Sequence, residues 1–231
     1  MSVVLITGGN KGLGYETARR LIAMGHQVYL GCRDAERGKK AAEELGAGLV
    51  MLDVTSDDSV AGAVEALSAM VDHIDVLINN AGVSGKFMKP EDMTSEEMLR
   101  VYNTNVFGVV RVTGAFLPLL RKSENPVIVN VASGLGSFGM VTDPSTMESQ
   151  ITSLAYCSSK SAVAMLTLQY AKGLPDIKVN CADPGATATD LNGFRGKQTV
   201  EEGTDAIVQL ATIGKDGPTG LYVNREGRMP W

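Results

Sequence analysis

The sequence predicts an α/β fold, a single doubly wound domain with a parallel sheet of about seven strands flanked by helices. Short aliphatic and β-branched runs recur without polar alternation, as in strands buried on both faces. Stretches with helical periodicity separate these runs, as in right-handed βαβ units. The 231 residues contain no repeat, low-complexity tract or linker. Residues 1–231 are therefore expected to form one domain.

The first half of the chain alternates strands and helices in a regular order. Runs rich in valine, leucine and isoleucine predict strands at Val3–Thr7, Gln27–Cys32, Gly48–Leu52 and Asp75–Asn79. Helical periodicity predicts helices between them at Leu13–Met24, Asp34–Leu45 and Ser56–Val71. Ser56 is a plausible N-cap of the third helix, because acids follow it in the first turn.

The second half continues this alternation. Thr94 to Glu97 has the form of a capping box that opens a long helix, and Thr199 to Glu202 repeats that form. The remaining predicted elements are strands at Pro126–Ala132, Ile177–Ala182 and Gly220–Val223 and a helix at Ala155–Leu174. Strands that alternate with helices from end to end are typical of a Rossmann-type domain.

Composition argues against several classes of function. The chain is 44% hydrophobic and 20% charged, with a net charge of -5, whereas nucleic-acid and anionic-membrane surfaces need a basic face. No apolar run approaches the ~20 residues that cross a bilayer. Met1–Thr7 reads as a strand rather than a secretory leader. We expect a cytoplasmic protein that binds neither nucleic acid nor membrane.

The three cysteines, Cys32, Cys157 and Cys181, are widely scattered. They have no metal-ligand spacing, and any disulfide scheme leaves one unpaired. We therefore expect free thiols in a reducing compartment and no metal site.

A glycine-rich turn follows the first strand, with the sequence Thr7-Gly8-Gly9-Asn10-Lys11-Gly12-Leu13-Gly14. Glycines allow a tight turn and a close approach to a pyrophosphate, and the following helix directs its N-terminal amides at the phosphates. An isolated glycine cluster can be only a turn. Its place between the first strand and the first helix favours a dinucleotide cradle.

The end of the second strand favours NADP(H) over NAD(H). NAD enzymes place an acid there for the ribose 2′-hydroxyl, but here Cys32-Arg33 ends the strand. The Arg33 guanidinium suits a 2′-phosphate, and Lys11 adds a second charge. Alternatively both are solvated charges, and Asp34 neutralises Arg33 or caps its helix.

Tyr156 and Lys160 are four positions apart on a predicted helix, so they share one face. A nearby ammonium favours the phenolate and should lower the pKa of the tyrosine toward the working range. The pair alone is also compatible with an ordinary exposed helix turn.

Across its whole length the chain resembles the short-chain dehydrogenases/reductases, and among them the NADPH-dependent carbonyl-reductase-like members. The motifs that carry the resemblance are Thr7-Gly8-x-x-x-Gly12-x-Gly14, Asp53, Asn79-Asn80-Ala81-Gly82, Asn105, Ser133, Tyr156-x-x-x-Lys160, Pro184-Gly185 and Thr189. They follow successive strand ends, the rim where open α/β sheets bind ligands.

The resemblance implies a set of NADP(H)-binding residues. Asp53 would contact the adenine with the Val54 amide beside it, whereas Asn79 is similar to a structural asparagine. The remaining implied cofactor residues are Gly8, Asn10, Lys11, Gly12, Leu13 and Gly14 in the turn, Arg33, Asn80, Ala81 and Gly82 along the ribose, and Pro184, Gly185, Thr187 and Thr189 beside the nicotinamide, with Tyr156 and Lys160. For Thr187 we expect a backbone contact.

The resemblance also implies hydride transfer between NADP(H) and a small carbonyl or alcohol substrate. Tyr156 would be the general acid or base, and Lys160 would tune it and bond the ribose hydroxyls. Ser133 would stabilise the developing alkoxide. The main chain of Asn105 would hold a proton-relaying water.

Two segments depart from the family pattern. The stretch between Ser133 and Tyr156 is long, and its apolar residues Phe138, Met140, Met147 and Ile151 suggest a substrate wall. The segment from Thr189 to Thr199 is a short lid, which suggests an open cleft.

The helix that carries Tyr156 is apolar nearly all round and needs cover on both sides. A homo-oligomer, a dimer or a tetramer, would supply that cover.

Two other functions remain open. Nucleotide-sugar epimerases and dehydratases also use Tyr-x-x-x-Lys, but usually with Gly-x-x-Gly-x-x-Gly and a large C-terminal domain, and this chain has neither. Non-catalytic NADP-sensing modules typically lose the tyrosine or the lysine, whereas this chain keeps both.

Overall fold

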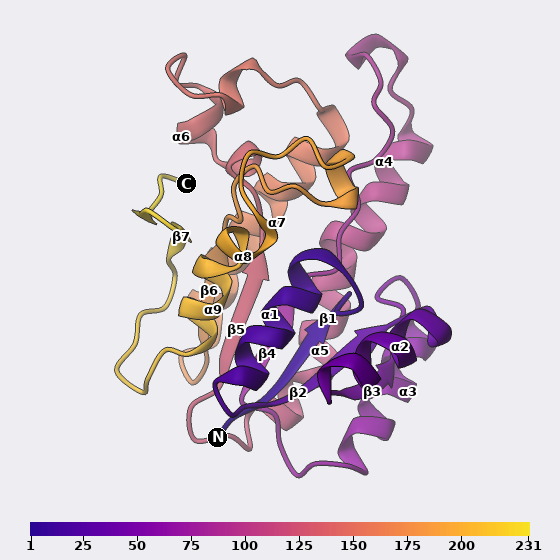
Figure 1. Ribbon diagram of the computed structural model, residues 1–231. Helices are drawn as coiled ribbons and strands as arrows, with labels where there is room; N and C mark the ends of the chain where they lie inside the picture. Colours follow the sequence, from indigo (N-terminus) through magenta and orange to yellow (C-terminus); the bar gives the residue numbers. More distant parts are fainter.

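The computed structural model describes residues 1–231 and contains one eight-stranded sheet (Figure 1). Its order is β3-β2-β1-β4-β5-β6-β7-β8, and all neighbours pair in parallel except β7 and β8. The strands are β1 Val3–Thr7, β2 Gln27–Cys32, β3 Gly48–Met51, β4 Val76–Asn79, β5 Val127–Val131, β6 Lys178–Ala182, β7 Tyr222–Asn224 and β8 Gly227–Arg228. The predicted α/β class is confirmed.

The sheet has one strand beyond the seven expected. β8 pairs Val223 with Arg228 and Asn224 with Gly227 in a short antiparallel hairpin. Two exposed residues carry no hydrophobic alternation, so the sequence gives no sign of this strand.

The helices flank the sheet on both faces. They are α1 Gly12–Ala23, α2 Ala35–Leu45, α3 Asp57–Ser68, α4 Ser95–Tyr102, α5 Gly108–Leu120, α6 Phe138–Val141, α7 Leu154–Gly173, α8 Val200–Gly203 and α9 Asp205–Ala211. A π-helical segment, Asn103–Phe107, joins α4 to α5. Short 3₁₀ turns are η1 Pro90–Asp92, η3 Gly134–Gly136, η4 Glu148–Gln150 and η5 Asp190–Asn192.

Two hydrophobic clusters cover the two faces of the sheet. Adjacent residues of β1 belong to different clusters, because strand side chains alternate between faces. Ile6 packs with residues of α1, α2 and α9, whereas Leu5 packs with residues of α3 and α5. A third cluster, which includes Val163, Cys181 and Tyr222, fixes α7 against β6 and β7. This packing explains why the strands carry no polar alternation.

Most of the expected caps are present. Asp34 accepts a hydrogen bond from the Arg37 amide at the start of α2, which confirms one of the roles considered for it. Ser56 caps α3, and Thr199 forms a complete capping box on α8. The box expected at Thr94 is only half formed, because the Glu97 carboxylate accepts from the Lys86 amide and the Arg100 side chain instead.

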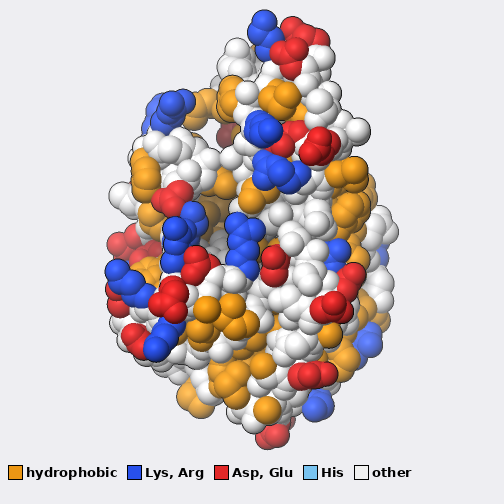
Figure 2. Space-filling view, turned by 90° about the vertical axis from the view of Figure 1, so that its right-hand side faces the viewer, with side chains coloured by type: hydrophobic (Ala, Val, Ile, Leu, Met, Phe, Trp, Pro, Cys, Tyr) orange, Lys and Arg blue, Asp and Glu red, His pale blue; other side chains and the backbone are white.

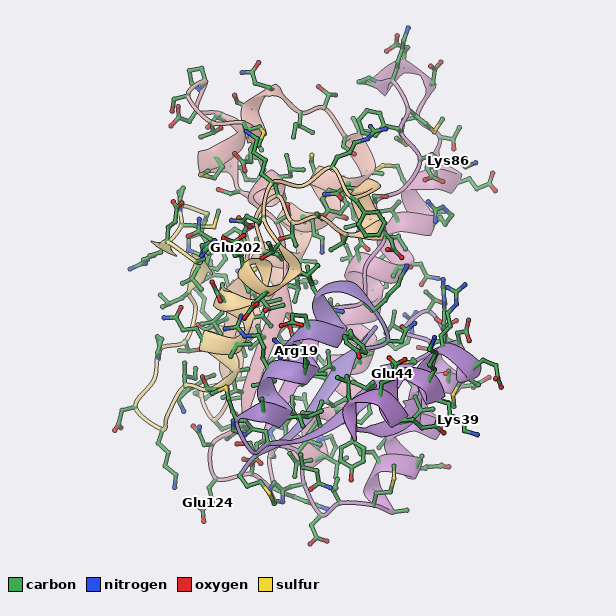
Figure 3. The ribbon with its side chains drawn as sticks, viewed as in Figure 1. Arg19, Lys39, Glu44, Lys86, Glu124 and Glu202 are labelled. Atoms are coloured by element: carbon green, nitrogen blue, oxygen red, sulfur yellow. The ribbon has the colours of Figure 1, made fainter.

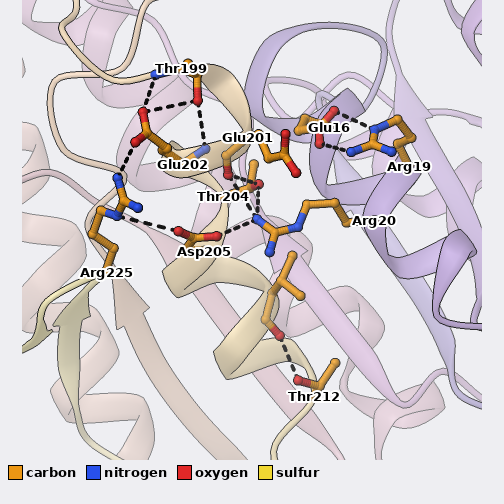
Figure 4. A network of polar contacts seen from close by, with 11 residues as sticks. Glu16, Arg19, Arg20, Thr199, Glu201, Glu202, Thr204, Asp205, Thr212 and Arg225 are labelled. Atoms are coloured by element: carbon orange, nitrogen blue, oxygen red, sulfur yellow. Dashed lines mark hydrogen bonds and ion pairs between the residues drawn. The ribbon is translucent and has the colours of Figure 1, made fainter.

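A polar network holds the C-terminal helices against α1 (Figure 4). Arg20 of α1 donates to the Glu201 carbonyl and, at 2.8 Å, to Asp205. Arg225, which follows β7, bonds Glu202 at 2.7 Å and approaches Asp205 at 3.5 Å. These contacts anchor the end of the lid segment that precedes α8.

The strand order reverses at β1, which lies between β2 and β4. The carboxyl ends of all the parallel strands point to the same edge of the sheet, where such folds bind ligands. In Figure 1 the segments around α4 and α6 rise above this edge, whereas the N-terminus lies at the opposite end. No helix combines the length and the apolar character that spanning a membrane requires.

Candidate active site

The glycine turn between β1 and α1 has the geometry of an anion cradle. Gly8 and Gly12 have φ values of 66° and 55°, in the left-handed region that favours glycine. A Cβ on Gly14 would lie 2.5 Å from the Gly8 carbonyl oxygen, so a side chain there would displace the turn. The N-cap Lys11 makes no side-chain cap, and the first turn contains no acid. The helix therefore presents free amides that suit phosphate.

Asn80 supports this turn from the end of β4. Its amide nitrogen Nδ2 donates to the Thr7 carbonyl at 2.9 Å and to the Gly8 carbonyl at 3.2 Å. The Thr7 hydroxyl accepts from the Asn80 and Ala81 amides. Asn79 faces the other way, into a buried network with Thr113 and Asn130, as its structural interpretation requires.

A basic cavity of about 250 Å³ opens beside the turn. Its lining residues are Asn10, Lys11, Arg37, Lys40, Ala41 and Glu44. Arg33 is exposed at the end of β2 and is not part of this lining. Arg37 and Lys40 escaped the sequence analysis, although they lie one and nearly two helical turns beyond Arg33 and so could have been found.

Two of the three positive side chains that line this cavity form ion pairs at 3.4 Å or less. Lys11 contacts Asp190 of η5 at 2.7 Å, and Arg37 approaches Asp34 at 3.4 Å. All four side chains are largely exposed, so these ion pairs are weak and can exchange for a phosphate. Figure 2 shows a hollow on this side of the molecule with Lys and Arg side chains on both sides of it.

Asp53 follows β3 and is held in place by Thr55. It accepts from the Thr55 amide at 2.9 Å and from its hydroxyl at 2.7 Å. Burial alone would raise the pKa of Asp53, but these bonds and the charges of Arg33 and Arg111 bring it below its usual value. Val54 is buried, and its carbonyl accepts from Arg111.

Tyr156 and Lys160 share one face of α7, as their spacing predicts. Lys160 Nζ is 5.7 Å from the centre of the Tyr156 ring and donates to the Val131 carbonyl at 2.8 Å. Lys160 is 5% exposed. A Cβ on Gly82 would lie 3.7 Å from this Nζ and 3.5 Å from Asn105 Oδ1, so the end of β4 meets α7 here.

The expected lowering of the tyrosine pKa by Lys160 is wrong for this structure. Burial raises the pKa of Tyr156 above its usual range, and the carboxylate of Asp183 acts in the same direction, against the Ser133 side chain. Burial also lowers the pKa of Lys160 to about 8. At neutral pH the phenol is therefore neutral and the amine is charged, a combination that suits proton donation.

Ser133 begins the glycine-rich loop after β5. Its hydroxyl accepts from the Leu135 amide at 3.3 Å, and its carbonyl accepts from the Tyr222 hydroxyl. A Cβ on Gly136 would lie 2.4 Å from the Lys160 carbonyl carbon, so only glycine lets this loop pack on α7. Ser133 is thereby fixed between β7 and the helix of Tyr156.

Asn105 lies in the π-helical segment and is fully buried. Its Nδ2 donates to the Val83 carbonyl and to Ser159 Oγ, both at 2.9 Å, and its Oδ1 accepts from the Val83 amide. The side chain thus links the segment after β4 to α7, one residue before Lys160.

The segment after β6 approaches the glycine turn. Pro184 is buried and Gly185 is exposed, with a φ of 67°. The buried Thr187 hydroxyl donates to the Pro184 carbonyl at 2.8 Å, so its side chain is already engaged. A Cβ on Gly12 would lie 3.7 Å from the Thr189 methyl group, which places the start of the lid over the turn.

Apolar side chains on two segments near this edge are exposed. They are Phe138, Met147 and Ile151 of the long segment between Ser133 and Tyr156, and Leu191 and Phe194 of the lid. Met140, also expected in the wall, instead packs partly into the third core cluster.

The family model for short chain dehydrogenases matches residues 2–199. A short-chain dehydrogenase from Penicillium roqueforti is 37% identical over 225 residues, covering 92% of this chain and 89% of the relative.

Two solved reductases share the fold closely. The NADPH-bound carbonyl reductase from chicken fatty liver superposes with a TM-score of 0.88 at 27% identity, covering 100% of this chain and 99% of that one. The 3-ketoacyl-(acyl-carrier-protein) reductase from Brucella melitensis, complexed with NADH, gives 0.84 at 28% identity, with 96% of each chain covered. The chain belongs to the short-chain dehydrogenase family and is an oxidoreductase of the nicotinamide-dependent kind.

Proposed function

We propose that this dehydrogenase reduces a ketone or aldehyde with NADPH, and that Tyr156, Lys160, Ser133 and Asn105 form its catalytic set. The observation that carries the proposal is the convergence of these residues at one rim. Lys160 and the Tyr156 ring lie together on α7, with Gly82 and Asn105 beside the amine and Ser133 on the adjoining loop.

Each of these side chains has a separate task in carbonyl reduction. NADPH, when bound, supplies the hydride. The neutral Tyr156 hydroxyl donates a proton to the carbonyl oxygen, and the Lys160 ammonium stabilises the phenolate left behind. The Ser133 hydroxyl donates a hydrogen bond to the oxygen as negative charge develops on it. Asn105 holds Val83 and Ser159 in place around Lys160.

The choice of NADP(H) rests on the charges at the adenosine end. Arg37, Lys40 and Lys11 line the cavity beside the turn, and Arg33 stands at the end of β2, where an NAD enzyme places an acid. Guanidinium groups suit a 2′-phosphate because they donate several hydrogen bonds in a fixed fork. The remaining turn, ribose and nicotinamide contacts are those that the family resemblance implies.

The substrate class follows from the exposed apolar residues above the site. Phe138, Met147 and Ile151 on one segment and Leu191 and Phe194 on the other favour a bulky apolar carbonyl compound. The screen that tests this measures NADPH oxidation across aldehydes, ketones, quinones and diketones of increasing size.

The catalytic assignment is tested by Tyr156→Phe, with Tyr170→Phe as the matched control on the same helix. Tyr170 packs against the core beneath the sheet and its hydroxyl has no hydrogen-bond partner. We expect Tyr156→Phe to bind NADPH normally and to lose ~10²–10⁴ in turnover. Near-normal turnover in Tyr156→Phe would refute the assignment.

We further propose a cytoplasmic homo-oligomer, either a dimer or a tetramer. Met165 and Leu154 leave apolar surface on α7 exposed, and a second subunit could cover it. Size-exclusion chromatography with light scattering measures the mass directly. A monomer would contradict the proposed assembly.

A further inference from the structure

The segment Met229–Trp231, which we call the strap, packs against the loop that follows Ser133, and none of the assigned roles uses it. In Figure 1 the C-terminus lies directly beneath α6. Met229 is buried, and its amide donates to the Tyr222 carbonyl of β7 at 2.8 Å. The Trp231 and Tyr222 rings are 5.5 Å apart, centre to centre, at an interplanar angle of 42°. These contacts fix the strap against β7.

The hydroxyl of Tyr222 holds the start of the loop. Tyr222 is fully buried in the third core cluster, and its hydroxyl donates to the Ser133 carbonyl. That carbonyl also accepts from the Gly136 amide at 2.7 Å. Gly136 packs directly on the backbone of Lys160. The first residues of the loop are therefore held from β7 on one side and from α7 on the other.

The strap holds the far end of the same loop. Ser137 is fully buried, and its hydroxyl donates to the Pro230 carbonyl at 2.7 Å. The same hydroxyl caps α6 by accepting from the Met140 amide at 3.1 Å. The Gly139 amide donates to the backbone oxygen of Trp231 at 2.9 Å. A Cβ on Gly139 would lie 2.5 Å from Cβ of Pro230, so only glycine lets α6 approach the strap this closely.

Phe138 lies between these two anchored residues, and its side chain is 69% exposed. Consecutive residues span at most ~3.6 Å each, so its Cα is within ~7 Å of the Gly136 Cα, which packs on the helix of the catalytic pair. The backbone of Phe138 is thus fixed while its ring is free to meet a ligand. A rigid apolar ring beside a catalytic helix suits one wall of a substrate site.

We propose that Phe138 determines the preference for bulky carbonyl substrates and that the strap positions it through Ser137 and Gly139. The inference rests on the proposed function and assigns to that site the residue that distinguishes large substrates from small ones. A wall that is already ordered in the free enzyme loses little conformational freedom when a substrate binds, so its contacts count fully toward affinity. The strap is a positioning element, since its hydrogen bonds are to the loop.

The test compares kcat/KM for benzil with kcat/KM for diacetyl, two diketones that differ in the size of their substituents. Ser137→Ala releases α6 from the strap, and the preference for benzil should fall about tenfold. Phe138→Ala should lower the preference by the same factor. The double variant should lose no more than Phe138→Ala alone, because the strap acts through that ring. The ratio does not depend on the amount of folded enzyme, so a loss of stability alone leaves it unchanged.

A second readout does not need catalysis. Trp231 is the only tryptophan of the chain, so its fluorescence reports the strap. In Ser137→Ala its emission should move to longer wavelength, as the released ring gains contact with water. Ser56→Ala is the matched control, because it also removes a capping serine, from α3, and should change neither the preference nor the emission. If Ser137→Ala does not fold, Trp231→Phe loosens the strap from its other side and should lower the preference in the same way.

The outcomes separate this inference from the catalytic assignment. Normal NADPH fluorescence titration shows that a variant is folded. An unchanged preference for benzil in the folded strap variant, or losses that add in the double variant, overturns the role of the strap and leaves the catalytic assignment standing. Wild-type turnover in Tyr156→Phe overturns the catalytic assignment itself.

Discussion

The charged side chains at the two ends of the candidate site differ in their exposure to water. At the adenosine end Lys11, Arg37 and their partner acids are largely exposed, so water and salt screen them. At the catalytic end Lys160 and Asp183 are each 5% exposed. Exposed charges can select an anionic cofactor. Buried charges instead fix which groups carry protons, which is what acid–base chemistry needs.

The largest difference between the two ends of the site should be in turnover, when one lysine is replaced by an uncharged residue at each end. Lys160→Met keeps a similar length and removes the buried charge, so turnover should fall by ~10²–10³, since Tyr156 loses its electrostatic support. Lys11→Met should change kcat little and act on cofactor affinity instead. Steady-state kinetics with saturating NADPH measure both. Equal effects of the two variants on kcat would contradict the prediction that Lys160 acts on turnover and Lys11 on cofactor affinity.

The glycine turn should be less tolerant than an ordinary helical glycine. In Gly14→Ala the new methyl group would meet the Gly8 carbonyl oxygen and Asn80 Nδ2, at 2.5 and 2.6 Å. The turn must shift, and we expect NADPH affinity to fall about tenfold or more. Gly62→Ala on α3, where a Cβ meets nothing within 4 Å, should instead stabilise the protein by ~0.5–1 kcal/mol. Fluorescence titration and thermal unfolding report the two effects, and unaltered NADPH binding in Gly14→Ala would exclude the cradle.

Cofactor selection should be sensitive to Arg37 and insensitive to its neighbour Lys39. Arg37→Ala should weaken NADPH binding about tenfold and leave NADH binding nearly unchanged, because only the 2′-phosphate loses a charged donor. Figure 3 shows Lys39 on the outer side of α2, away from the cavity, and Glu44 on the side toward α1, so Lys39→Ala is the matched control. Equal losses for NADPH and NADH would remove the argument for a phosphate subsite.

The smallest effect should come from Asp190, the partner of Lys11 in the lid. Asp190→Asn frees Lys11 and removes a negative charge from the phosphate side, so NADPH affinity should rise by up to about threefold at low salt. The gain should vanish at ~1 M salt, where such exposed charges are screened. A loss of affinity would mean that the ion pair supports the cofactor-binding conformation.

Local patterns were enough to predict the parts of the fold that depend on periodicity. The β-branched runs at Val3–Thr7 and Gln27–Cys32 and the cap at Ser56 were predicted correctly, because buried strands and helix starts leave local signals. β8 and the π-helical segment around Asn105 were missed, because neither has a distinct composition.

The residues of the candidate site also fall into those that sequence patterns could place and those that only the folded structure could place. Tyr156 and Lys160 could be placed on one helix face from their spacing alone. Asp183 could not be placed, because an acid before Pro184-Gly185 reads as an ordinary turn residue. Only the sheet order, which sets the end of β6 beside β5 and β7, brings it to the rim where Lys160 bonds the Val131 carbonyl. The rise in the Tyr156 pKa was likewise hidden, since burial is a property of the folded chain.

The most direct test of the account is the pH dependence of carbonyl reduction by the wild-type enzyme. Lys160, with a pKa of about 8, should be charged below that pH and neutral above it, while Tyr156 keeps its proton. We therefore predict that kcat/KM is constant at neutral pH and falls as the pH rises through about 8. A rate that increases through this range, or that stays constant to pH 10, would contradict the proton-donating pair at the centre of the account.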